Sequence, residues 1–227
     1  MSDQAAIAFT VGAHVNRKVA LLQRGYCERS GPYASRARGI LAQLRRLGQS
    51  GGSLVECGEL ILDGWPSEKL AEAGASRRDE DRAFDVVKLA ISLYALHQQS
   101  LARRCAVVYA ADQESAEGHD LKRTGSFGCA CRQIERDLDN ASGVQRHMSV
   151  LETPIDFDRL AYEMRCLIGL MKNPRSGESI LLDYGHLARD LYLIRVSPRA
   201  RSRVISRWAR DYYGAGAKAE ASQNQSK

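Results

Sequence analysis

The chain has 227 residues, of which 44% are hydrophobic, so it can form one large domain or two small ones with buried cores. Its 33 Lys and Arg exceed its 27 Asp and Glu, and the net charge of +6 permits a nucleic-acid partner without requiring one. No apolar run approaches the roughly 20 residues that span a bilayer, and the first residues, MSDQAAIAFTV, lack the features of a signal peptide. The six cysteines are scattered without CxxC spacing. We therefore expect a cytoplasmic protein with reduced thiols and no membrane segment.

Helical periodicity dominates the first 140 residues. We expect helices at about 12–29, over the segment PYASRARGILAQLRRLG, and from Asp79 onward, separated by Gly, Pro and Ser. The short run AVVYA at 106–110 is the one strand-like segment. Residues 112–125 are polar and contain two glycines, which predicts a surface loop. Ser126 then caps a helix that begins SFGCACRQI.

Four more helices are expected after the turn-forming residues DNASG at 139–143. They cover about 144–151, 156–172, a segment from Asp183, and a last segment with Ser197 as N-cap and Pro198 at the first helical position. The final residues, GAGAKAEASQNQSK, are small and polar. The sequence therefore predicts an all-α protein, two small helical bundles packed together, with an N-terminal domain over 1–140, a C-terminal bundle over 141–214 and a disordered tail over 215–227.

The last predicted helix carries a row of arginines. Helical geometry places Arg199, Arg203, Arg207 and Arg210 within an arc of about 80°, opposite a stripe of Val204, Ile205, Trp208 and Tyr212. No acid stands three or four residues away to pair with the row before Asp211. Guanidinium groups suit bidentate phosphate contact. The pattern favours contact with an anion over a merely solvated helix face.

Other candidate sites are weaker. The pairs Arg45–Arg46 and Lys122–Arg123 fit a solvated surface as well as a binding site. Arg165 lies midway along an apolar helix, where it could form an internal salt bridge or reach a ligand. No Walker A, GxSxG, HExxH or GxGxxG motif occurs, and the five histidines are isolated. We therefore predict no catalytic, metal or cofactor site.

Several blocks of the sequence together resemble the CasB family, the small subunit of the type I-E CRISPR Cascade complex. RARGILAQLRRL resembles the family's early A-x-L-R-R helix, and RTGSFGCACRQI stands in the place of R-G-x-S-L-G-x-A-x-R-x-L. LAYEMRCLIGLMKNPRSGESILLDYGHLARDL and the terminal R-x-R-V-x-x-x-W-A-R-D-Y-Y helix complete the order of blocks, over about 36–213. Phe127 stands where leucine is usual, and residues 101–120 differ in length, so neither carries a functional inference.

The resemblance implies a non-catalytic role in antiviral defence. CasB-like subunits are two-domain helical proteins, present as a pair within Cascade beside the large and backbone subunits. They help hold the crRNA, the target DNA and the displaced strand of the R-loop. Base pairing reads the sequence in such complexes, so the protein contacts should go to phosphates. The candidates at matching positions are Arg45, Arg46, Lys122, Arg123, Arg165, Arg199, Arg201, Arg203 and Arg207, with Arg201 lying toward the apolar side.

Three alternatives remain open. A free-standing DNA-binding regulator would need a helix-turn-helix with dimer symmetry. A small hydrolase or transferase would depend on a histidine or cysteine such as His97 or Cys129. A scaffold protein would use the arginines to contact acidic protein surfaces.

Overall fold

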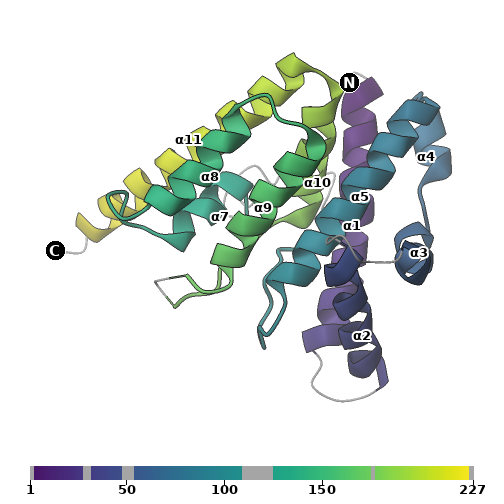
Figure 1. Cartoon of the computed structure of the whole chain (residues 1–227), viewed down its shortest axis with the longest axis horizontal. Coiled ribbons are helices and arrows are strands. Elements are labelled where there is room, and N and C mark those ends of the chain that lie inside the picture. Colours follow the sequence, from purple (N-terminus) through teal and green to yellow (C-terminus); the bar gives the residue numbers. More distant parts are fainter. Residues whose placement is uncertain (1–2, 28–31, 48–53, 109–124, 175–176, 225–227) are drawn as a thin grey trace.

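The computed structural model describes residues 3–27, 32–47, 54–108, 125–174 and 177–224. Within these ranges the backbone forms ten helices and no strand, and its one extended pairing is an isolated parallel bridge between Ala106 and Leu182. The prediction of an all-α fold is confirmed. The helices, shown in Figure 1, are α1 (Asp3–Cys27), α2 (Pro32–Leu47), α3 (Leu54–Leu62), α4 (Ser67–Glu72), α5 (Arg77–His97), α7 (Phe127–Ile134), α8 (Ser142–Glu152), α9 (Phe157–Met171), α10 (Tyr184–Val196) and α11 (Pro198–Asn224).

The N-terminal half packs α1, α2 and α5 against one another, with the short helices α3 and α4 beside them (Figure 1). Helix α1 begins at Asp3 rather than near residue 12, because Ile7 and Val11 extend its buried face backward at helical spacing. Helix α5 begins with a capping box. The Ser76 hydroxyl accepts a hydrogen bond from the backbone N–H of Asp79, whose carboxylate accepts one from the Ser76 N–H at 3.1 Å.

Helix α10 joins the two halves of the chain, since it packs against α1 and α5 as well as α11. Its close approach to α1 depends on two glycines. A Cβ atom on Gly12 would lie 2.7 Å from the carbonyl oxygen of Gly185, too close for any other residue without a shift of the backbone. Asp183 caps α10 by accepting a hydrogen bond from the N–H of His186 at 2.8 Å.

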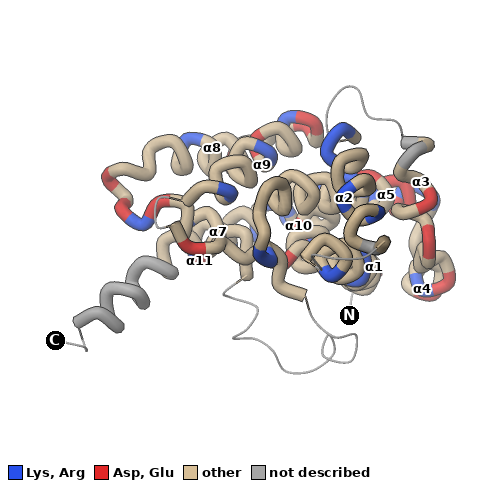
Figure 2. Tube along the Cα trace, turned by 90° about the horizontal axis from the view of Figure 1, so that it is seen from below, with Lys and Arg blue, Asp and Glu red and all other residues tan. Residues whose placement is uncertain are grey.

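The C-terminal half consists of α7, α8, α9 and α11. Figure 2 places α8 and α9 on one side of this half and α7 and α11 on the other. Helix α7 packs against α11 and α9, so it lies among the C-terminal helices although it precedes the expected boundary at residue 140. The division into domains at 140 and 141 stays a prediction.

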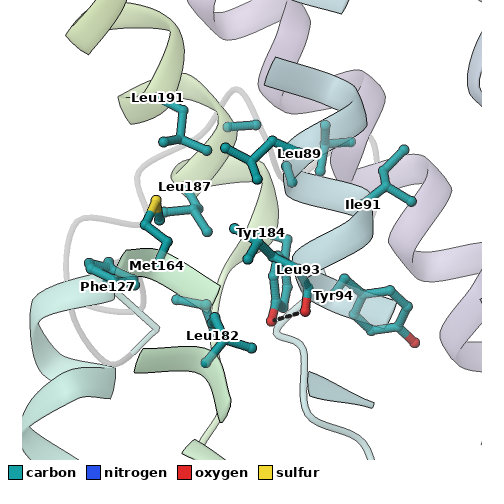
Figure 3. Close-up of a cluster of buried hydrophobic side chains, with 14 of the residues drawn as sticks. Leu89, Ile91, Leu93, Tyr94, Phe127, Met164, Leu182, Tyr184, Leu187 and Leu191 are labelled. Carbon is teal, nitrogen blue, oxygen red and sulfur yellow. Dashed lines mark hydrogen bonds between the residues drawn. The ribbon is translucent and has the colours of Figure 1, made fainter. Parts of the chain in front are cut away.

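The main core lies where α5, α9 and α10 meet (Figure 3). Leu93, Met164, Leu187 and Leu191 are all buried there. The phenol of Tyr184 enters the same core and donates a hydrogen bond to the Leu93 carbonyl at 3.4 Å. Burying these side chains supplies the driving force that fixes the helices, at roughly 1.5–3 kcal/mol for each large aliphatic group.

Helix α11 continues through Asn224, and the disordered tail expected over 215–227 stays a prediction. Over the described ranges, no helix combines the length and apolar character needed to cross a membrane.

Candidate nucleic-acid interface

The last helix presents three arginines of the predicted row to solvent, Arg199, Arg203 and Arg210. Arg199 and Arg203 are exposed on α11, and neither forms an ion pair with a described carboxylate. The Ser197 hydroxyl caps the helix by accepting a hydrogen bond from the N–H of Ala200 at 3.2 Å. On the opposite face Val204, Trp208 and Tyr212 of the predicted apolar stripe are buried, and Ile205 is half-buried against the core.

Arg207 is held by the protein itself. Its guanidinium forms an ion pair with the carboxylate of Asp190 on α10, a residue only 2% exposed. The indole N–H of Trp208 donates to the other oxygen of the same carboxylate at 2.7 Å. The sequence led us to expect no partner for this arginine, because only neighbours along its own helix were considered. The partner comes instead from the preceding helix.

Arg201 also faces protein atoms. Its Nη2 donates hydrogen bonds to the carbonyl oxygens of Leu151, at 2.9 Å, and Thr153, at 2.5 Å, at the end of α8. A guanidinium at this position stabilises the C-terminus of a helix. Burial lowers the pKa of Arg201, but these acceptors are neutral, so its charge is not cancelled.

Arg45 and Arg46 lie at the end of α2, where Arg45 is half-buried and Arg46 is exposed. Lys172, which directly follows α9, is influenced by the positive charge of Arg45. Lys172 Nζ donates to Gln99 Oε1 at 3.1 Å. Burial lowers the pKa of the Lys172 ammonium, and the positive charge of Arg45 lowers it further. No described carboxylate forms an ion pair with either cation.

Lys172 was missed in the sequence because it stands alone after an apolar helix, outside any basic pair. The available signal was its place just after the last turn of α9, where cations are favoured by the helix dipole. The influence of Arg45 on its pKa comes from a residue far apart in the chain, which no local pattern could reveal.

Arg165 lies on the same face of α9 as Lys172, two turns earlier, since seven residues make nearly two full turns. It is half-buried, and burial lowers its pKa. Its Nη1 is buried without a hydrogen-bond partner in the described structure. The internal salt bridge considered for it is not formed with Glu163, which pairs with Arg159 at 2.6 Å and His147 at 2.5 Å instead.

The candidate residues thus separate into two groups. Arg45, Arg165 and Lys172 belong to α2 and α9, whereas Arg199 and Arg203 belong to α11, on the other side of the C-terminal half (Figure 2). Lys122 and Arg123 lie outside the described residues. Among the residues that the structure describes, no carboxylate forms an ion pair with a cation of either group, as expected of surfaces that neutralise an anion.

The residues considered for catalysis are built into the fold. His97 is fully buried, with its Nδ1 3.0 Å from the hydroxyl of Tyr184, and burial lowers its pKa to about 4. The Cys129 thiol donates to the carbonyl of Asp211 at 3.7 Å. Among the side chains that the structure describes, no group of three or more His, Cys, Asp and Glu is placed to hold a metal ion.

Comparison with known proteins gives the same reading of the fold. The family model of the CRISPR-associated protein Cse2 matches residues 40–213. The crystal structure of CasB from Thermobifida fusca is similar with a TM-score of 0.64 and 26% identity, over 89% of this chain and 97% of that chain. That of M. ruber CasB has a TM-score of 0.54 and 21% identity, over 90% and 97% of the two chains. No curated protein sequence matches. Because the family model covers most of the chain, the protein belongs to the Cse2/CasB family, the small subunit of the type I-E CRISPR Cascade complex.

Proposed function

We propose that this Cascade subunit binds nucleic acid without catalysis. In this role it helps hold the crRNA, the target DNA and the displaced strand of the R-loop through phosphate contacts. The guide supplies the sequence information by base pairing, so the protein needs only to fix the path of the backbone. A second copy of the chain and the large and backbone subunits are its proposed partners within the complex.

The observation that carries this proposal is a group of cations, Arg45, Arg165 and Lys172, none of which forms an ion pair with a described carboxylate. Arg45 and Lys172 repel each other, and the repulsion contributes to the lowered pKa of Lys172. The hydrogen bond to Gln99 keeps the ammonium in place in spite of that repulsion. A phosphate bound between the two side chains would relieve it, because each cation would gain an anionic neighbour. Arg165, with its unpartnered Nη1, extends this group along α9.

Arg199 and Arg203 form a second contact surface on α11. They lie one turn apart on an exposed face, which suits successive phosphates of a strand. Since the two groups face different sides of the subunit, we assign them to different strands or to different segments of one strand.

The distribution of acidic residues supports this orientation. Asp and Glu gather over α3, α4 and the start of α5 (Figure 2). Exposed carboxylates there include Glu68, Glu72 and Glu80. A polyanion would be repelled from this end of the molecule, so the nucleic acid should keep to the α2–α9 and α11 surfaces.

The test is a binding experiment with labelled single-stranded DNA and RNA, followed by fluorescence anisotropy. The double variant Arg45→Glu/Lys172→Glu should bind about tenfold or more weakly than the wild type. The matched control is Lys69→Glu/Arg77→Glu, which makes the same change in net charge at two exposed positions of the acidic end. If the control weakens binding as much as the double variant, the proposal of a local phosphate site is wrong.

A further inference from the structure

A groove separate from the α2–α9 surface runs between the two halves of the chain. Two overlapping cavities, of about 350 and 740 Å³, lie among the start of α5, the α8–α9 connection, the end of α10 and the start of α11. Four arginines line both cavities, and we call this the arginine groove; they are Arg78, Arg82, Arg195 and Arg201.

Three of these arginines are held in fixed positions by the protein. Arg82 pairs with Asp79 at 3.0 Å, and Arg195 pairs with Asp85 at 2.9 Å. Arg201 is held by the two carbonyl oxygens at the end of α8. Each of these bonds uses a single terminal nitrogen, so other N–H groups of each guanidinium remain for a ligand. Folding therefore already fixes these guanidinium groups, so a ligand that binds them causes little further loss of conformational entropy.

The lining between the arginines is aliphatic. Ile155 and Ile194 line both cavities, and Ile205 and two prolines line the larger one. Carboxylates are present as well, with Asp81 in the smaller cavity and Glu152 in the larger. The groove thus combines an apolar floor with charges of both signs.

These features disfavour a nucleic-acid strand as the occupant. Single strands bind proteins through aromatic stacking combined with a uniformly positive path. The aromatic ring in this groove, Phe157, is already covered by the guanidinium of Arg195, 4.2 Å from the ring centroid. Asp81 and Glu152 would also repel a chain that carries a charge on every nucleotide.

We infer that the arginine groove receives an extended polypeptide segment of a neighbouring Cascade subunit. Aliphatic side chains of this segment pack on the isoleucine floor, and at least one of its carboxylates binds Arg78 and Arg201. Arg78 is exposed and has no ion-pair partner among the described residues, so it is free to close over the segment. The inference rests on the proposed assembly with other subunits but not on the proposed nucleic-acid contacts.

Hydrogen–deuterium exchange tests this inference. One arm compares the isolated chain with the assembled complex after nuclease treatment. The other adds labelled single-stranded DNA to the isolated chain. We expect slower exchange of the backbone amides in three segments of the nuclease-treated complex, and no such protection in the isolated chain with or without DNA. The segments are 78–82, 152–157 and 195–206. Protection produced by DNA on the isolated chain would make the groove a nucleic-acid site, and no protection in the complex would leave it unoccupied; both overturn the inference.

A pair of adjacent variants adds a second measurement. Arg78→Glu should weaken binding to a complex assembled without this subunit by about tenfold or more, because it places a like charge against the carboxylate of the partner. Arg77→Glu changes the neighbouring residue, which is also exposed but does not line the groove, and should bind as the wild type does. Equal affinities of the two variants would contradict the inference. The two proposals can also fail separately. If the groove is protected in the complex but Arg45→Glu/Lys172→Glu binds DNA as the wild type does, only the nucleic-acid proposal is refuted.

Discussion

Trp208 and Asp190 join the last two helices: the indole N–H donates to the carboxylate at 2.7 Å in the interior. The same carboxylate holds Arg207, and His186 lies 3.6 Å from it. One buried acid therefore organises the contact between α10 and α11, and the orientation of Arg199 and Arg203 depends on it.

Replacing Asp190 with alanine should lower the free energy of unfolding by about 2–4 kcal/mol, because the indole N–H and the guanidinium lose their acceptor together. Urea denaturation monitored by tryptophan fluorescence measures this loss. Glu72→Ala, at an exposed position on α4, is the control and should change stability by less than about 0.5 kcal/mol. A loss for Asp190→Ala as small as that of the control would show that the network contributes little.

Gly128 on α7 packs directly against α11. A Cβ atom there would overlap the carbonyl oxygen of Trp208 and lie 2.9 Å from the Cβ of Asp211. Gly128→Ala should therefore destabilise the protein by about 1–3 kcal/mol, measured as a lower Tm. At Gly143 on α8 an added Cβ meets nothing within 4 Å, so Gly143→Ala should leave the Tm unchanged or raise it. The same shift in both variants would mean that helix propensity, not packing, decides the result.

His97 makes the fold sensitive to acid. Burial lowers its pKa in the folded state to about 4, against 6.5 for an unperturbed histidine. The unfolded chain therefore binds the proton more readily, and stability falls as the pH drops from about 6.5 to 4, by about 3 kcal/mol in total. Between pH 6.5 and 4 the free energy of unfolding of His97→Gln should therefore fall by about 3 kcal/mol less than that of the wild type. Urea titrations at several pH values measure this difference. Parallel pH profiles for the two proteins would refute the assignment.

The local signals in the sequence were sufficient for most helices. The caps predicted at Ser126 and Ser197 each form the expected hydrogen bond, and the helix start predicted at Asp183 is confirmed, with Asp183 as its cap. The beginning of α1 was missed although Ile7 and Val11 continue its periodicity.

The candidate site was harder to predict, because its arrangement depends on contacts between distant segments. Periodicity identified Arg199 and Arg203 as an outer face, but it gave no sign that Asp190 would hold Arg207. The same limitation hid Lys172, which becomes notable only because the charge of Arg45, on a distant part of the chain, lowers its pKa. Arg78 and Arg201 line one groove although they are more than a hundred residues apart, and no local sequence pattern predicts this.

The salt dependence of binding to single-stranded nucleic acid tests the central claim most directly. Each phosphate contact contributes about 0.7 to the slope of log K against log salt concentration. The account predicts a steep slope for the wild type and a slope smaller by about 1.4 for Arg45→Ala/Lys172→Ala, with the fold unchanged by circular dichroism. Identical slopes for the two proteins, or wild-type binding that does not respond to salt, would contradict it.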